Sequence, residues 1–303
     1  HLSLRRQRQM CRRDSIITLS QGTQAATGSM SEPINKNWED AYMFLKDKTA
    51  KDAVVGTWWD PGHMITALGE RRAIADGAHC ARDSCFYGIN DRIVDLGSIF
   101  ASEDENKALQ LIRKYKGTSK NIYWIASDDL IGKYQWLQYF GTGCDSRSDP
   151  KCRIYVNVPR YSLRYTQTGE IGAIEYRLTD IQKIILLLGQ IPMPIFIEGS
   201  NAALFDEIIY NNGNNSQIIP VKSLKDSLIQ NLKPMEQQLN VVLSNETIPM
   251  TVYIPDHLSY LTVIPPRLRN TMFTKMFFLE GQGLEKFEKV FGNSQVKIYE
   301  VKL

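Results

Sequence analysis

The sequence lacks an apolar run long enough for a membrane-spanning helix, which needs ~20 consecutive apolar residues. Its nearest approach, residues 184–197, is interrupted by two prolines, a glycine and a glutamine, and we interpret it as buried core. The 303 residues are 43% hydrophobic and 23% charged. This ordinary globular composition excludes wholesale disorder, collagen-like repeats and a coiled-coil rod. The length predicts about two domains, or one core with insertions.

The body of the chain has no surplus of positive charge. The net charge of +3 includes a cluster of five arginines near the N-terminus: Arg5, Arg6, Arg8, Arg12 and Arg13. Without it the chain is slightly acidic, so no nucleic-acid partner is expected. Residues 1–30 have no initiator methionine and no apolar core of a signal peptide. We interpret them as a low-complexity tail, either added for expression or the torn end of a longer chain. A basic arm for lipid head groups or nucleic acid is the alternative.

Signatures of several enzyme classes are missing. The sequence contains no Walker A motif, no HExxH and no Gly-x-Ser-x-Gly, which argues against a P-loop nucleotidase, a zincin and an α/β-hydrolase. Two Gly-x-Gly fragments, at 141–143 and 281–283, lack the third glycine of a dinucleotide loop and are interpreted as turns. A self-contained hydrolase with Asp60 or Asp128 as general base remains a weak alternative, because it lacks a paired nucleophile.

The five cysteines include two local pairs in polar surroundings, Cys80 with Cys85 and Cys144 with Cys152. Because short polar loops close easily, disulfides are favoured over free thiols. The CxxC spacing of a zinc site is absent, so zinc is the least favoured alternative and no metal ligands are predicted. Disulfides would indicate an oxidising compartment. Two glycosylation-type triplets, at 214–216 and 245–247, agree weakly with that.

The hydrophobic pattern predicts an α+β fold, with a mixed helical core at 31–150 and a β-richer remainder of the same globular domain at 151–303. Helices are expected from an Asn37 cap, at 64–71, from a Ser102/Glu105 capping box to 115, and at 130–140, 178–188, 201–210 and near 267 and 284. Strands are expected at 53–59, 121–126, 154–156, on both sides of 168–170, and at 194–197, 251–254, 276–279 and 296–301.

Two of the expected strands end in chemically useful side chains. Trp58-Trp59-Asp60 ends the first, and Asp128-Asp129, followed by Lys133, ends the second. Ligand crevices tend to form at the carboxyl ends of strands, so the two ends would share a cleft if the strands are neighbours. Two tryptophans on a strand would point to opposite faces, and both could equally be core. A carboxylate with two indole donors would satisfy a hydroxyl, which favours a pocket for Ser or Thr.

The motif Trp58-Trp59-Asp60-Pro61-Gly62 resembles the WWDYG signature of the STT3/AglB/PglB family, the catalytic subunits of asparagine-linked oligosaccharyltransferases. The resemblance, of archaeal AglB type, extends over about residues 31–303. Further matching segments are 37–41, 53–55, 70–72, 76–77, the DxxK-like 129–133 and 267–279. In the family this region is a globular C-terminal domain on the extracytoplasmic face of the cell membrane.

The resemblance implies that the chain binds the Ser or Thr of an Asn-x-Ser/Thr acceptor polypeptide. Residues implied for this pocket are Trp58, Trp59, Asp60, Lys133 and Leu137, with Leu137 meeting the threonine methyl. Supporting roles are expected for Asp128, Asp129 and His63. The family's catalytic carboxylates, its Mn2+ or Mg2+ and its lipid-linked oligosaccharide site belong to a multispanning N-terminal domain. No catalytic residue and no cofactor are therefore expected in this fragment, which should recognise acceptor without transferring sugar.

Three positions depart from the family pattern. Pro61 replaces the aromatic residue of WWDYG. Asp129 and Lys133 are four residues apart rather than three, so either Asp128 or Asp129 could pair with the lysine. Leu137 stands where methionine or isoleucine is usual. The main alternative function is an extracellular carbohydrate- or protein-binding module in which Trp58 and Trp59 stack on a ligand.

Overall fold

The structure, a computed structural model, describes residues 35–77, 89–152, 154–213 and 215–303. It divides between residues 40 and 41 into two compact units. In the first unit the described residues begin helix α2 (Lys36–Lys48), whose first turn is capped by Asn35 rather than by the predicted Asn37: the Asn35 side chain accepts from the N–H of Trp38 at 3.1 Å. All other elements belong to the second unit. The predicted tail, Cys11, Cys80 and Cys85 lie outside the described residues.

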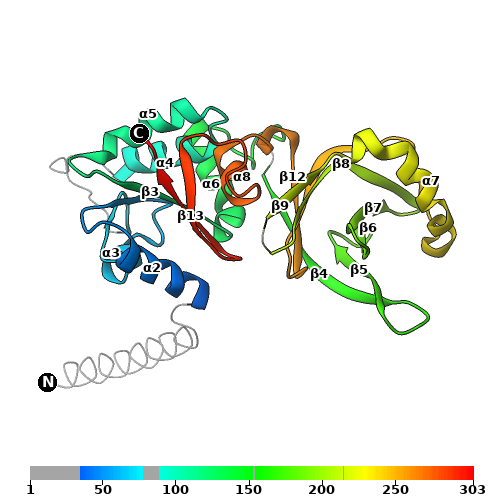
Figure 1. Cartoon of the computed structure of the whole chain (residues 1–303). Coiled ribbons are helices and arrows are strands. Elements are labelled where there is room, and N and C mark those ends of the chain that lie inside the picture. Colours follow the sequence, from blue (N-terminus) through cyan, green and yellow to red (C-terminus); the bar gives the residue numbers. More distant parts are fainter. Residues whose placement is uncertain (1–34, 78–88, 153, 214) are drawn as a thin grey trace, which may run out of the picture. The chain divides into compact units, whose positions relative to one another are not determined.

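A five-stranded sheet with helices packed around it forms one part of the fold (Figure 1). Its order is β13 (Phe287–Gly292), β14 (Val296–Val301), β3 (Ile122–Ser127), β1 (Val54–Gly56) and β2 (Arg72–Ala73). Strands β3, β1 and β2 are parallel, and β14 runs antiparallel to β3. Every residue of β3 is buried, which fits a central strand that is covered on both faces.

Short helices surround this sheet: α3 (Gly62–Ala67), α4 (Ile89–Ala101), α5 (Glu105–Lys116), α6 (Asp129–Thr142) and α8 (Met272–Phe277). One apolar cluster joins them to it and contains, for example, Trp124 of β3, Leu96 of α4, Ile112 of α5, Leu130 of α6 and Phe273 of α8. Burial of these side chains is the main stabilising contribution to the layer.

A second sheet has its own apolar cluster. Its strands are β4 (Val156–Tyr165), β5 (Ile171–Arg177), β6 (Gln182–Leu187), β7 (Met193–Glu198), β8 (Asn201–Asn211), β9 (Ser216–Ile219), β10 (Val242–Leu243), β11 (Ile248–Ile254) and β12 (Tyr260–Ile264). Strand β8 pairs with β7 along its first half and with β11 along its second, so the sheet curls back on itself. Helix α7 (Val221–Leu239) packs beside β8 (Figure 1).

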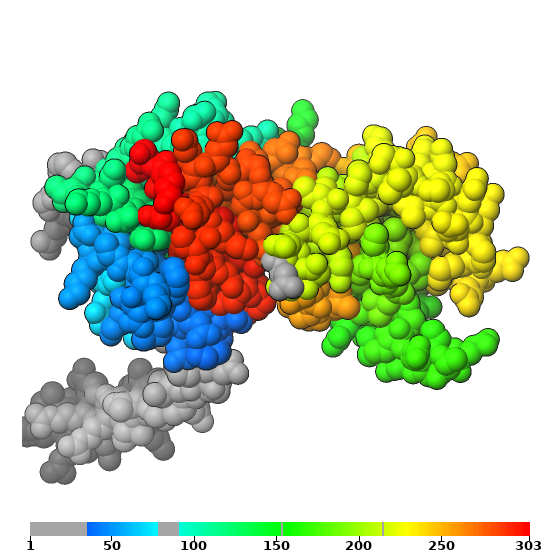
Figure 2. Space-filling model, viewed as in Figure 1, coloured from blue at the N-terminus to red at the C-terminus, as the bar shows by residue number. Residues whose placement is uncertain are grey.

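After the second sheet the chain returns to the first. A 3-10 turn, η1 (Pro266–Leu268), leads through α8 into β13 and β14, and β14 completes the first sheet beside β3. Figure 2 shows these C-terminal residues in red, packed among residues of the first half of the chain. The predicted α+β class is confirmed. The predicted division at residue 150 stays a prediction.

Several predicted elements have the wrong type. The helices expected at 178–188 and 201–210 are strands β6 and β8. Consecutive residues in both strands are buried, so side chains on both faces are covered. The alternation that identifies a strand is then lost, and the apolar run is compatible with a helix. Helices α4 and α7 were not predicted.

At the C-terminal end, the strand expected at 276–279 begins inside helix α8, and no helix forms near 284. The missed signal is Thr271, whose hydroxyl caps α8 by accepting from the N–H of Thr274. Helix α5 is likewise capped by Asp104, one residue before Glu105, and not by the predicted Ser102. The Asp104 side chain accepts from the N–H groups of Asn106 and Lys107.

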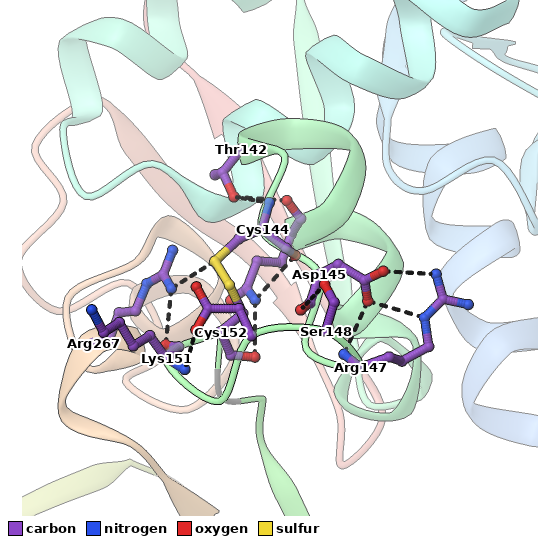
Figure 3. The surroundings of a disulfide bond; sticks show 10 residues. Thr142, Cys144, Asp145, Arg147, Ser148, Lys151, Cys152 and Arg267 are labelled. Atoms are coloured by element: carbon purple, nitrogen blue, oxygen red, sulfur yellow. Dashed lines mark hydrogen bonds and ion pairs between the residues drawn. A yellow bond between two sulfur atoms is a disulfide. The ribbon is translucent and has the colours of Figure 1, made fainter.

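A disulfide joins Cys144 and Cys152, the pairing that the sequence favoured for this loop (Figure 3). It closes the chain just after helix α6. Gln138 of α6 donates to the carbonyl oxygen of Cys152 at 3.2 Å, and Arg267 of η1 donates to that of Lys151 at 3.0 Å.

Loss of this disulfide is expected to lower the free energy of unfolding by about 2–3 kcal/mol, because a short closed loop restricts the unfolded chain. Urea unfolding of a Cys144→Ser/Cys152→Ser double variant measures the effect. Peptide mapping without reductant should recover the two cysteines in one linked fragment. Recovery of both as alkylated thiols from protein exposed to oxidising conditions would contradict the pairing.

Within the described ranges, no helix combines the length and the apolarity that crossing a membrane requires.

Candidate functional site

The two strands that end in polar side chains are parallel neighbours. Val54 of β1 pairs with Ile122 of β3, and Gly56 pairs with Trp124. Their carboxyl ends therefore lie at the same edge of the sheet, as the sequence analysis required for a shared cleft. Asp60 follows β1 and Asp129 follows β3, so this register brings the two carboxylates together.

Strand β1 is shorter than predicted and ends at Gly56. A Cβ atom on Gly56 would lie 2.1 Å from the indole of Trp124, so only glycine lets the two strands approach this closely. Trp58 and Trp59 consequently lie beyond the strand, in the turn before Asp60, and the expectation that they alternate on a strand is wrong. The turn closes through the N–H of Gly62, which donates to the carbonyl oxygen of Trp59 at 3.0 Å.

Lys133 connects the two strand ends. Its Nζ lies 2.8 Å from Oδ2 of Asp129 and 3.3 Å from Oδ2 of Asp60. On α6 the four-residue spacing places Lys133 one turn after Asp129, which suits an ion pair. The hydroxyl of Ser127, at the end of β3, donates to the other oxygen of Asp129 at 2.5 Å. Asp129, and not Asp128, is thus the partner of the lysine.

Lys133 is charged at neutral pH. Burial favours the neutral amine, but the hydrogen bond to Asp129 and the charges of Asp129 and Asp60 outweigh it and raise the pKa of Lys133. One ammonium faces two carboxylates, so the group carries one net negative charge. The Oδ2 atom of Asp60 is buried, and its polar neighbour is the Lys133 ammonium. The Asp60 side chain as a whole is 32% exposed.

Asp128 lies beside this group but makes a different contact. Its backbone N–H donates to the carbonyl oxygen of Gln295 at 2.9 Å, which links the site to the β13–β14 turn. Burial, and secondarily the charge of Asp129, raises the pKa of Asp128 from its ordinary 3.8 to about 6.

The raised pKa of Asp128 has a consequence for stability. Between pH 4 and 6 the folded state binds the extra proton, so stability falls as pH rises through this window. An Asp128→Asn variant lacks this titrating carboxyl group, so its free energy of unfolding should depend less on pH in the same window. Urea midpoints at ~pH 4.5 and ~pH 7 test the difference. An unchanged slope in the variant would assign the proton uptake to another group.

The two tryptophans flank the carboxylate on its N-terminal side. Trp58 is 3% exposed, and its ring lies 6.3 Å from that of Phe140 near the end of α6. Trp59 is partly buried against the same core. No hydrogen bond joins either indole N–H to another described residue. Buried indoles usually find a hydrogen-bond partner, so these two N–H groups are candidates to donate to a ligand.

The remaining predicted site residues lie less favourably. Leu137 is one turn beyond Lys133 and has no exposed surface, so it can act on a bound threonine only if α6 shifts; its contact stays a prediction. His63 is exposed, with Nδ1 3.9 Å from Asp76. His63 and Trp59 both adjoin Gly77, where a Cβ would lie 3.0 Å from the histidine and 3.7 Å from the indole.

Sequence reasoning missed Ser127 and Phe140, which position Asp129 and Trp58. The available signals were the serine two residues before the aspartate and an aromatic residue seven positions after Lys133 on the same helix face.

A metal is not expected to bind at this carboxylate pair, because the Lys133 ammonium occupies the space between them. Within the described part of the chain, no group of three or more His, Cys, Asp or Glu side chains is arranged to hold an ion.

Comparisons with known proteins identify relatives of this chain. No family model matches. The STT3B subunit of the Arabidopsis thaliana dolichyl-diphosphooligosaccharide–protein glycosyltransferase is 32% identical over 157 residues, which are 45% of this chain and 20% of that protein. The dolichyl-phosphooligosaccharide-protein glycotransferase 2 of Pyrococcus furiosus is 28% identical over 104 residues, 30% of this chain and 14% of that protein. The chain thus spans a fifth or less of these relatives.

Among solved structures, the C-terminal domain of C. jejuni PglB has the same fold. It superposes with a TM-score of 0.53 at 14% identity, covering 88% of this chain and 100% of that domain. This chain therefore has the fold of that C-terminal domain. The sequence relatives in archaea and plants, all named as oligosaccharide–protein glycosyltransferases, support an STT3/AglB-type C-terminal domain.

Proposed function

We propose that this chain recognises the hydroxyl of Ser or Thr in Asn-x-Ser/Thr acceptors, as the acceptor-binding part of an oligosaccharyltransferase. The observation that carries the proposal is the Asp60 carboxylate, which Lys133 holds through one oxygen while the side chain stays partly exposed. A fixed carboxylate acceptor is suited to a hydroxyl donor, and a charge-assisted hydrogen bond of this kind is stronger than a neutral one.

The unpaired indole N–H groups of Trp58 and Trp59 complete the recognition. A hydroxyl has one donor and two acceptor sites. Asp60 would accept its proton, and the indoles would donate to its lone pairs. A valine side chain has the same shape as threonine but would leave all three protein groups unpaired. Discrimination by such unpaired polar groups is much stronger than discrimination by a missing methylene.

The burial of Trp58 argues against the alternative, in which Trp58 and Trp59 form a platform that binds sugar or protein. A tryptophan that stacks on a ligand must expose its ring face, whereas Trp58 is 3% exposed and packs against Phe140.

The activity of the full enzyme is part of this proposal. Matched relatives are named for transfer from dolichyl-linked oligosaccharide to protein. We infer that the full protein carries out this reaction at the extracytoplasmic face of a membrane. The lipid-linked donor and Mn2+ or Mg2+ would bind outside the described residues. The present chain alone, supplied with donor, peptide and metal, should show no sugar transfer.

Peptide binding tests the proposal. An Asn-Ala-Thr peptide carrying a photo-crosslinker, which offsets weak affinity, is compared with Asn-Ala-Val. The threonine peptide should bind roughly 5- to 150-fold more tightly, corresponding to ~1–3 kcal/mol for unpaired buried groups. Equal capture of both peptides by folded protein would overturn the proposal. Preferential capture of a free sugar at Trp58 would favour the binding-module alternative.

A further inference from the structure

A second polar cavity lies elsewhere in the described residues, with a volume of about 140 Å3. Its walls come from the end of β8, the end of β11 and the loop after it, Glu280 three residues after α8, and the β13–β14 hairpin. None of Trp58, Trp59, Asp60 or Lys133 lines it.

Glu280 organises the charges in this cavity. Its Oε1 accepts from Nζ of Lys297 at 2.6 Å and from the side-chain amide of Asn211 at 3.1 Å. Its Oε2 accepts from Nζ of Lys289 at 2.8 Å. Glu280 and Lys297 are each 7% exposed. Burial opposes ionisation, but the hydrogen bonds and charges of the two lysines lower the pKa of Glu280, so the carboxylate stays charged.

The buried ammonium of Lys297 has donors to spare. An ammonium has three N–H donors, and among the described residues only Glu280 accepts from Lys297. Leaving buried donors unsatisfied is costly, so the other two N–H groups call for an acceptor in the cavity that Lys297 lines. The main donor in this cavity, Lys297, is only 7% exposed and is held in place by Glu280, which favours a specific binding site over an incidental surface depression.

The cavity also offers acceptors, and its charges balance. Asp256 lines the same space and receives the N–H of His257 on one oxygen at 2.8 Å. The two lysines are offset by Glu280 and Asp256, which leaves no net charge to select an anion. A ligand that fits must be neutral and must both donate and accept at several points. A ring with several hydroxyl groups meets these requirements.

We propose that this cavity binds one neutral monosaccharide unit, with Lys297 and Asp256 as its donor and acceptor. The choice of a sugar among polyhydroxylated ligands rests on the proposed function. Its position supports that choice, because Gln295, next to the lining residue Ser294, accepts from the backbone N–H of Asp128. The hairpin that lines the cavity is therefore connected to the β3–α6 turn, which carries Asp128 and Asp129.

Saturation-transfer NMR on the full chain tests this proposal with glucose, galactose, mannose and N-acetylglucosamine as probes. At least one should bind with a dissociation constant on the order of millimolar, as expected for a ligand of about a dozen heavy atoms. Ser294→Trp fills the cavity from an exposed turn and should abolish the signal. Ser148→Trp, in another exposed turn, is the matched control and should retain it. Lys297→Met should weaken binding at least tenfold.

Salt and competitors separate the ligand classes. Binding of a neutral sugar should be unchanged between about 50 and 500 mM NaCl, whereas an anion would be screened. Three results would each overturn the proposal. They are the absence of a saturation-transfer signal from every sugar, a signal that survives Ser294→Trp, and steep salt dependence of binding with displacement by inorganic phosphate. N-acetylglucosaminyl-asparagine and N-acetylglucosamine 1-phosphate then distinguish a product glycan from a donor glycan by which binds more tightly.

The same variants keep this proposal distinct from the proposed function. The Ser294→Trp variant should no longer bind sugar but should still prefer the threonine peptide. Asp60→Ala should lose that preference and keep the sugar.

Discussion

An Asp60→Ala variant is expected to bind Asn-Ala-Thr and Asn-Ala-Val peptides with equal affinity, because its affinity for the threonine peptide falls to that for the valine peptide. In the native chain Nζ of Lys133 lies 3.3 Å from Oδ2 of Asp60, and the Asp60 side chain is partly exposed. Alanine removes that acceptor and leaves the hydroxyl without its strongest partner, which costs ~1–3 kcal/mol or roughly 5- to 150-fold in affinity. Photo-crosslinking yield against peptide concentration measures both affinities.

A matched control separates this effect from a general loss of charge. Glu288 forms an exposed pair with Lys302 at 3.2 Å on the outer strand β13, and Glu288→Ala should retain full discrimination. Lys133→Met should reduce discrimination partially, because Asp60 keeps its acceptor but loses the cation that positions it. If Asp60→Ala, with a native circular dichroism spectrum, still prefers threonine, the site assignment is wrong and the double tryptophan serves only as core.

The two strand ends show how much of the candidate site could be predicted from the sequence. The motif after each strand was local. The rule that parallel strands end together would place Asp60 near Asp129 only if the two strands are neighbours, and the structure shows that they are. The choice between Asp128 and Asp129 was not local. It depends on which carboxylate the first turn of α6 directs toward Lys133 and on the hydroxyl of Ser127, which a sequence pattern does not resolve.

The errors in the second half have a common cause. Residues 182–187 and 201–211 are strands in a sheet that closes through β8, and consecutive buried residues show that both faces of these strands are covered. Periodicity then disappears, and an apolar run is compatible with either a helix or a strand. The cavity beside Glu280 was equally inaccessible to sequence reasoning, because Asn211, Glu280 and Lys297 come from distant segments that only tertiary pairing assembles.

The second large effect is expected where helices α4 and α6 cross. A Cβ on Gly141 would lie 2.2 Å from the backbone carbon of Gly97, and one on Gly97 would lie 2.5 Å from the carbonyl oxygen of Leu137. The opposing atoms belong to the backbone and cannot rotate away. Gly141→Ala should therefore push the helices apart and destabilise the fold by ~1–3 kcal/mol, the usual cost of overpacking. Urea unfolding measures the change.

Gly132 provides the internal control, because it lies in the same helix and a Cβ added there would have no neighbouring atom within 4 Å. Gly132→Ala should stabilise by up to ~1 kcal/mol, since alanine is the better helix former. The opposite signs at two glycines of one helix distinguish close packing from helix propensity. Because α6 carries Lys133, a tilt forced at Gly141 should also weaken threonine discrimination, whereas Gly132→Ala should leave it intact. Equal stability changes at both positions would show that the crossing tolerates a side chain and that α6 is not positioned by it.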